Sequence, residues 1–119
     1  MCGIAGFVDF ESKLELQDLK SMTDALNHRG PDSGGYAIHQ TPNANIGLGH
    51  RRLSIIDLSA NANQPMSKSD VEIVFNGEIY NYKELREDLL KKGHQFENDS
   101  DTEVLLTGYL EYGLDFLNQ

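Results

Sequence analysis

Segments with the pattern of β-strands cluster in this chain beside segments of helical periodicity, and this order constrains the fold more than any other feature. The strand-like segments are residues 3–10, 36–39, 46–50, 53–57 and 71–75. Helical spacing of apolar residues marks 16–26 and the region that follows residue 81. Strands gathered between helices are typical of layered domains. We therefore expect one small domain over residues 1–119, of α/β or α+β class with mainly antiparallel strands, and assign it to α+β.

The first helix is indicated by apolar residues three or four positions apart: Leu16, Leu19, Met22, Ala25 and Leu26. It is expected to end in the segment HRGPD. Gly30 is suited to a C-cap, and Pro31 cannot continue a helix because it lacks an N–H group.

Two later helices are indicated by the spacing of a capping box, in which a polar N-cap residue precedes an acid by three positions. Asn81 with Glu84 has this spacing, and so does Ser100 with Glu103. Gly93 is expected to end the first of these two helices.

Two segments in the middle of the chain complete the expected organisation. The VEIVF segment, 71–75, is rich in β-branched residues and is predicted to be a buried strand. The LSANANQPM segment, 58–66, is predicted to be a polar loop.

The charge balance excludes several classes of partner. The chain has a formal net charge of −9, whereas nucleic acids and anionic membranes require basic patches. It has no apolar run near the roughly 20 residues that span a bilayer, and no basic segment followed by an apolar core as in a signal peptide. We therefore expect a cytoplasmic protein without nucleic-acid or membrane partners. The four histidines lie far apart, so no metal site is expected.

The only cysteine, Cys2, directly follows the initiator methionine. A single cysteine forms no internal disulfide, and most lone cysteines act only as small hydrophobic residues. Removal of Met1 would give Cys2 a free α-amine with a pKa of about 7.7–8.0 beside its thiol. One residue would then carry a nucleophile and a general base.

The FNGEIYN segment has two interpretations. Asn76-Gly77 is a common turn dipeptide, and a hairpin or a strand-to-helix corner is the simpler one. The side-chain N–H of Asn76 and the backbone N–H of Gly77 could instead converge as an oxyanion hole.

Charged residues elsewhere also allow two interpretations. Arg51 and Arg52 are neighbours in an extended segment, so only one of them can enter a given pocket. That arginine is either solvated or binds a carboxylate. Asp101 is either a helix-capping acid or a carboxylate for a substrate ammonium group. Arg29 and Asp32 either belong to the end of a helix or order a loop near the site.

Taken together and in this order, the motifs resemble those of class II glutamine amidotransferases, most closely the glutaminase domain of asparagine synthetase. They are MCGIAGF, NHRGPDSGG, GHRRLSIIDLS, QPM, VFNGEIYNYKELR and SDTEVLL. The resemblance implies an αββα sandwich of the N-terminal nucleophile hydrolases. Domains of that family are longer than 119 residues, so we expect this chain to be the N-terminal part of one, truncated at its C-terminus.

The resemblance also implies roles for particular residues. Cys2 would be the nucleophile once Met1 is removed, and Asn76 with Gly77 would form the oxyanion hole. Arg52 would bind the α-carboxylate of L-glutamine, while Arg51 would face away. The remaining substrate-binding residues implied are Leu53, Ile55, Glu78 and Asp101, of which Glu78 and Asp101 would bind the α-ammonium group.

In that family, ammonia passes to a synthetase domain that uses ATP and Mg²⁺, and this chain has no phosphate-binding glycine motif. The domain itself is expected to need no cofactor, and a homodimer of the full-length protein is possible. The predicted function is glutamine hydrolysis for asparagine synthesis. Two alternatives are a catalytically silent interaction module and an amidotransferase for a sugar or polysaccharide acceptor.

Overall fold

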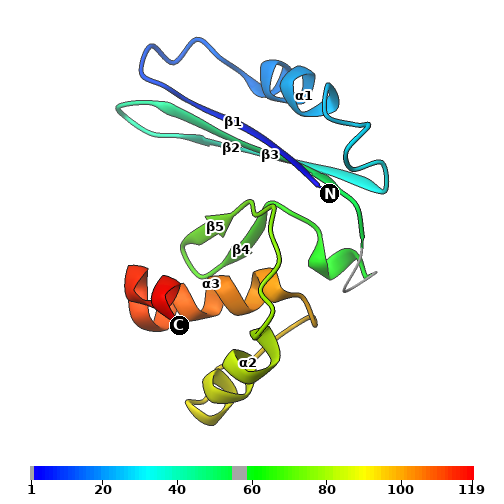
Figure 1. Cartoon of the computed structure of the whole chain (residues 1–119). Coiled ribbons are helices and arrows are strands. Elements are labelled where there is room, and N and C mark those ends of the chain that lie inside the picture. Colours follow the sequence, from blue (N-terminus) through cyan, green and yellow to red (C-terminus); the bar gives the residue numbers. More distant parts are fainter. Residues whose placement is uncertain (1, 55–58) are drawn as a thin grey trace.

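The computed structural model describes residues 2–54 and 59–119, which form a mixed α+β structure (Figure 1). Its strands are β1 (Gly3–Asp9), β2 (Ser33–Gln40), β3 (Asn45–Arg52), β4 (Met66–Lys68) and β5 (Val71–Ile73). Its helices are α1 (Leu16–Asp24), α2 (Tyr82–Lys91) and α3 (Asp101–Tyr112), with short 3₁₀ helices at Ala60–Ala62 and Gly113–Asn118. All described strand pairs are antiparallel, so the expected class and strand direction are confirmed.

The larger sheet has the order β1-β3-β2, with β3 in the centre. Gly3 pairs with Arg51 and Asp9 with Asn45, so β1 begins where β3 ends. This register places Cys2 beside the residues that follow β3, about fifty positions away in the sequence.

The elements form successive layers (Figure 1). Helix α1 covers one face of the three-stranded sheet, the β4–β5 hairpin lies on the other side of that sheet, and α3 lies beyond the hairpin. Leu19 and Thr23 of α1 are fully buried. A Cβ at Gly49 of β3 would come within 2.0 Å of Thr23 Oγ1, so α1 can approach this closely only where β3 has a glycine. A second core, around Leu89, Val104 and Phe116, joins α2 and α3.

Gly30 is not the C-cap of α1, which contradicts the expectation from the sequence. The helix ends at Asp24 with Ala25 as its C-cap, and turns lead from there to Gly30. A Cβ at Gly30 would lie 2.3 Å from the carbonyl oxygen of Arg51. Glycine is therefore required here by the close approach of two backbones, a long-range contact that the local pattern does not reveal.

The strands expected at 3–10, 36–39, 46–50 and 71–75 are present, with different bounds. The strand expected at 71–75 ends at Ile73 and is half-buried rather than buried. The expected polar loop at 58–66 contains a 3₁₀ helix and ends in β4, which the sequence analysis missed. Leu53 and Ser54 are irregular, and the rest of the strand expected at 53–57 lies outside the described residues.

The two expected capping boxes are absent as such. The Asn81 side chain makes no capping hydrogen bond at the start of α2. Ser100 does cap α3 by accepting the N–H of Glu103, but the Glu103 carboxylate instead accepts the N–H groups of Glu97 and Asn98. The backbone N–H groups of the preceding loop thus take the place of the Ser100 N–H as donors to this carboxylate.

The expected end of α2 at Gly93 is confirmed in detail. Gly93 has a φ of +95°, and its N–H bonds to the carbonyl of Leu90. The N–H of His94 bonds to the carbonyl of Leu89, which completes a Schellman motif. Across residues 2–54 and 59–119, no helix has both the length and the apolar character needed to cross a membrane.

Candidate active site

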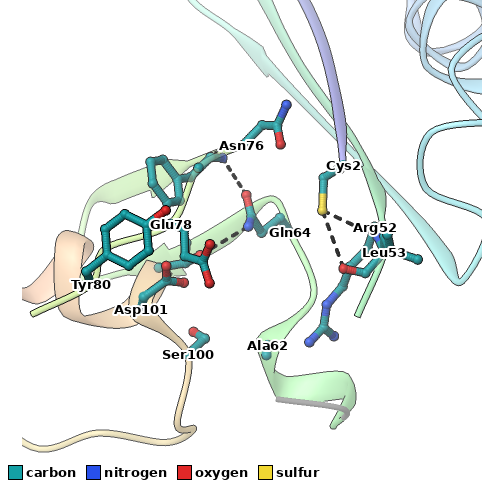
Figure 2. A pocket seen from close by; sticks show the side chains of 13 residues that line it. Cys2, Arg52, Leu53, Ala62, Gln64, Asn76, Glu78, Tyr80, Ser100 and Asp101 are labelled. Atoms are coloured by element: carbon teal, nitrogen blue, oxygen red, sulfur yellow. Dashed lines mark hydrogen bonds between the residues drawn. The ribbon is translucent and has the colours of Figure 1, made fainter. Parts of the chain in front are cut away.

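A cavity of about 390 Å³ lies where the start of β1, the end of β3, the segment after β5 and the start of α3 meet (Figure 2). Seven of the eight site residues predicted from the sequence line it: Cys2, Arg52, Leu53, Asn76, Gly77, Glu78 and Asp101. The eighth, Ile55, lies outside the described residues. The fold therefore brings together residues that are up to about a hundred positions apart.

The sulfur of Cys2 is held by the backbone of Leu53. The Leu53 N–H donates to Sγ over 3.3 Å, and the thiol is 3.6 Å from the Leu53 carbonyl oxygen, to which it donates. Cys2 is half-buried and its side chain points into the cavity (Figure 2). The register of β1 against β3 creates this contact, because it sets the first residues of the chain beside the end of β3.

Arg52 lines the cavity and Arg51 does not. Arg52 is only 7% exposed, and its Nη1 donates to the Ser59 carbonyl over 2.8 Å and to Asn63 Oδ1 over 2.7 Å. Arg51 points to the other side of the sheet, where its Nε donates to the Gly30 carbonyl over 3.0 Å. The two side chains thus alternate along β3 as a strand requires.

The Asn76–Glu78 segment follows β5 and is exposed at the rim of the cavity. In the part of the chain that the structure describes, the Asn76 amide makes no hydrogen bond, so it does not stabilise a turn through its side chain. A Cβ at Gly77 would lie 2.5 Å from the Phe75 ring. A side chain at this position would therefore require the Phe75 ring to move.

Asp101 is a buried acid, 6% exposed, in the first turn of α3. Its Oδ2 accepts the N–H of Ile79 over 3.0 Å, so it ties the segment after Glu78 to the helix. The N-cap itself is Ser100, and Asp101 is therefore not the capping residue. The positive end of the helix dipole favours its negative charge.

Asp32 orders the loop that follows β3. Its Oδ2 accepts the N–H of Ser54 over 2.7 Å, one residue beyond Leu53. This contact supports the interpretation that Asp32 orders a loop near the site. Arg29 is exposed.

Gln64 is a cavity residue that the analysis of single positions missed. Its side-chain oxygen accepts the N–H of Phe75, and its Nε2 donates to Thr102 Oγ1 over 3.2 Å (Figure 2). A glutamine in a polar segment gives no local signal of such a role. Only its place in the QPM motif singled it out, and that motif assigned it no function.

His50 of β3 contacts the backbone of Phe75, the residue before the Asn76–Glu78 segment. It is 1% exposed, and its Nε2 is 3.2 Å from the Phe75 carbonyl oxygen. Burial lowers the pKa of His50 below its ordinary value, and the nearby Arg52 charge lowers it further, while the Phe75 bond opposes both. Because a carbonyl oxygen only accepts hydrogen bonds, Nε2 carries a proton and donates it to the Phe75 carbonyl.

Within residues 2–54 and 59–119, no three His, Cys, Asp or Glu side chains are grouped so that they could hold a metal ion. The polar side chains around the cavity are a thiol, a guanidinium group, two carboxylates, two amides and three hydroxyls. Such a set suits a small zwitterion with one negative and one positive end.

This chain is similar to a known protein family and to several curated proteins. The family described as "Glutamine amidotransferase domain" matches residues 1–119. Asparagine synthetase [glutamine-hydrolyzing] 3 of Bacillus subtilis (strain 168) is 45% identical over 122 residues, which cover 97% of this chain and 19% of that protein. Asparagine synthetase [glutamine-hydrolyzing] 1 of the same organism is 48% identical, covering 94% and 18%. Asparagine synthetase [glutamine-hydrolyzing] 1 of Arabidopsis thaliana is 39% identical, covering 99% and 20%. The chain thus spans about a fifth of the length of these relatives.

Proposed function

The chain belongs to the glutamine amidotransferase domain family, and on that premise we propose that it hydrolyses L-glutamine to L-glutamate and ammonia through a thioester on Cys2. The observation that carries this proposal is one cavity in which Cys2 lies across from Asn76 (Figure 2), and which Gly77, Arg52 and Asp101 also line.

The charges of the cavity suit the two ends of a free amino acid. Arg52 binds the α-carboxylate, for which a guanidinium fork is well shaped. Asp101 and Glu78 bind the α-ammonium group. Leu53 and Ile55 complete the substrate site beside the nucleophile.

The reaction proceeds in two steps of acyl transfer. The Cys2 thiolate attacks the carbon of the glutamine side-chain amide, and the Asn76 amide and the Gly77 N–H stabilise the oxyanion that forms. The carbon–nitrogen bond breaks, and the nitrogen takes up a proton and leaves as ammonia. Water then attacks the γ-glutamyl thioester, which releases glutamate and restores the thiol.

The general base is the α-amine of Cys2, acting directly or through a water molecule. In the chain as translated, this nitrogen is part of the peptide bond to Met1. The proposal therefore requires removal of Met1, after which the amine can take the thiol proton and deliver it to the leaving ammonia.

The protein that contains this domain uses the ammonia for asparagine synthesis, with aspartate as acceptor. Support comes from the relatives, whose names describe asparagine synthetases and whose chains are about five times as long. A synthetase domain that binds ATP and Mg²⁺ would be the partner of this one. The sequence of layers from α1 to α3 supports an αββα sandwich as the complete fold (Figure 1).

The test is glutamate release by the full natural chain, compared with Cys2→Ala and Cys2→Ser. Wild type should release glutamate and both variants should not. Intact mass should show the loss of one methionine, and a glutamine-like diazo-ketone should add to the new N-terminal residue. An active enzyme that retains Met1 would contradict the α-amine mechanism alone. A folded wild type that neither hydrolyses glutamine nor reacts with the diazo-ketone would favour a silent interaction module.

A further inference from the structure

Hydrogen bonds hold the backbone on both sides of the Asn76–Glu78 segment. On one side, Phe75 is held through both backbone polar groups: its N–H by Gln64 and its carbonyl by His50. On the other side, the N–H of Ile79 is held by Asp101. Since the Asn76 side chain makes no hydrogen bond with the described residues, its position depends on these anchors.

Gln64 is itself fixed to the three-stranded sheet. A Cβ at Gly35 of β2 would lie 1.9 Å from the Gln64 carbonyl oxygen, so the two backbones are in close contact. The neighbouring Asn63 accepts hydrogen bonds from Arg52 Nη1 over 2.7 Å and from Ser33 Oγ over 3.0 Å. The backbone of Gln64 thus lies against the three-stranded sheet, at whose edge Cys2 and Arg52 lie.

The side chain of Gln64 crosses from that sheet to the opposite wall of the cavity (Figure 2). Its oxygen accepts the N–H of Phe75, which precedes Asn76, and its nitrogen donates to Thr102, which follows Asp101. Gln64 is only 8% exposed, so competition from bulk water for these bonds is small. Because the Phe75 N–H can only donate, the Gln64 side-chain atom that faces it is the oxygen, and the atom that faces Thr102 is the nitrogen.

We propose that Gln64 is a positioning residue, which sets the distance between the Cys2 side of the cavity and the two oxyanion donors, Asn76 and Gly77. The inference rests on the proposed glutaminase function. It assigns to Gln64 no contact with the reacting atoms: Gln64 acts through the Phe75 backbone and through the start of α3.

The expected signature is a loss of kcat without a matching change in KM, because oxyanion donors act mainly in the transition state. Gln64→Met keeps the length of the side chain and removes both hydrogen bonds. A misplacement of about 1 Å costs up to about 10²-fold in rate. We therefore expect Gln64→Met to lower glutaminase kcat by about 10- to 100-fold, with KM within about threefold of wild type.

The variants are made in the full natural chain and assayed for glutamate release. Thr102→Val removes only the second hydrogen bond and should lower kcat less than Gln64→Met. Thr102→Ser keeps the hydroxyl and should restore kcat to near wild type. These two variants also test the proposal should Gln64→Met not fold. Thr23→Val is the control for lost stability, since it removes a buried hydroxyl that bonds to Leu19 in α1.

The double variant Gln64→Met with Asn76→Ala separates positioning from a general structural effect. If Gln64 acts through Asn76, the double variant should be little slower than Asn76→Ala alone, because the effects of coupled residues do not add. The amides of Phe75 and Gly77 should also exchange faster with solvent in Gln64→Met.

Several results would overturn the inference and leave the glutaminase function in place. These are an unchanged kcat in Gln64→Met beside an active wild type, a change mainly in KM, or a loss no larger than in Thr23→Val at equal melting temperature. The inference would also be overturned if the losses of kcat in Gln64→Met and Asn76→Ala were fully additive in the double variant. A wild type that binds no diazo-ketone and releases no glutamate would overturn the proposed function as well.

Discussion

Arg51 and Arg52 are consecutive residues of β3 whose guanidinium groups lie on opposite sides of the same sheet. Arg51 bonds to the Gly30 carbonyl on the side of α1, and Arg52 bonds to the Ser59 carbonyl and to Asn63 beside the cavity. Both arginines hold protein segments in place, so stability alone does not distinguish them. The distinction lies in which of them a substrate can reach.

Arg52→Ala should raise the KM for glutamine by about 10- to 100-fold, because a hydrogen bond to a charged group contributes about 1.5–3 kcal/mol. Ammonia-dependent synthesis by the full natural chain should be unchanged, since ammonia bypasses the glutamine site. Arg51→Ala is the matched control: it should lower the melting temperature and leave KM near wild type. A rise of KM in Arg51→Ala, and not in Arg52→Ala, would contradict the assignment.

Asp101 accepts a backbone hydrogen bond from Ile79 and is proposed to bind the α-ammonium group of glutamine, and two variants can separate these roles. Asp101→Asn keeps an oxygen to accept the Ile79 N–H but loses the charge, so KM for glutamine should rise while stability falls only by the helix-dipole contribution of about 0.3–1 kcal/mol. Asp101→Ala should raise KM and also lower the melting temperature further. Asp115→Asn, at an exposed position in the C-terminal 3₁₀ helix, controls for the loss of one charge. An unchanged KM in Asp101→Asn would limit Asp101 to a structural role.

Asn76→Ala distinguishes the turn interpretation from the oxyanion interpretation. Because the Asn76 amide is exposed and makes no hydrogen bond with the described residues, its removal should leave the melting temperature near wild type. As an oxyanion donor, it should lower kcat by about 10²–10³ with little change in KM. Both quantities are measured on the same preparation. A lowered melting temperature with a wild-type kcat would restore the turn interpretation.

His50 should make folding stability depend on pH. Its pKa in the folded state is lowered by burial, whereas an unfolded histidine titrates near about 6.5. Between these two pKa values the unfolded chain binds more protons, so stability rises with pH there. The contribution of His50 is therefore complete above about pH 6.5 and is lost as the pH falls through its folded-state pKa.

The measurement is the free energy of unfolding in urea from pH 7.5 to pH 5. Wild type should lose more stability on acidification than His50→Gln, which can still donate to the Phe75 carbonyl but does not titrate. His28→Gln, at an exposed position, should follow wild type. Parallel pH profiles for wild type and His50→Gln would show that His50 is not responsible.

The strands β1, β2, β3 and β5, the helices α1, α2 and α3, the alternation of Arg51 and Arg52 and the Ser100 cap could be predicted from local patterns, whereas β4 could not. Each depends on residues within a few positions of one another, where strand and helix periodicity decide the outcome. The roles proposed for Cys2, Asn76 and Asp101 came instead from the resemblance of whole motifs. Local patterns failed at Gly30, where the close approach of the Arg51 backbone requires glycine, and at Asn81, whose amide donates to the Gln119 carbonyl instead of capping α2.

The sequence by itself determined which residue types this domain contains and on which side of a strand each lies. Only the tertiary structure decided that Cys2 meets Leu53, that Asp101 bonds to Ile79, and that Gln64 joins Phe75 to Thr102. These contacts join residues 11 to 51 positions apart, and they follow from the register of β1 on β3 and the approach of α3 to the hairpin. The physical reason is that hydrogen bonds of buried polar groups are satisfied only once the whole chain has packed, so no local window of sequence specifies the partner.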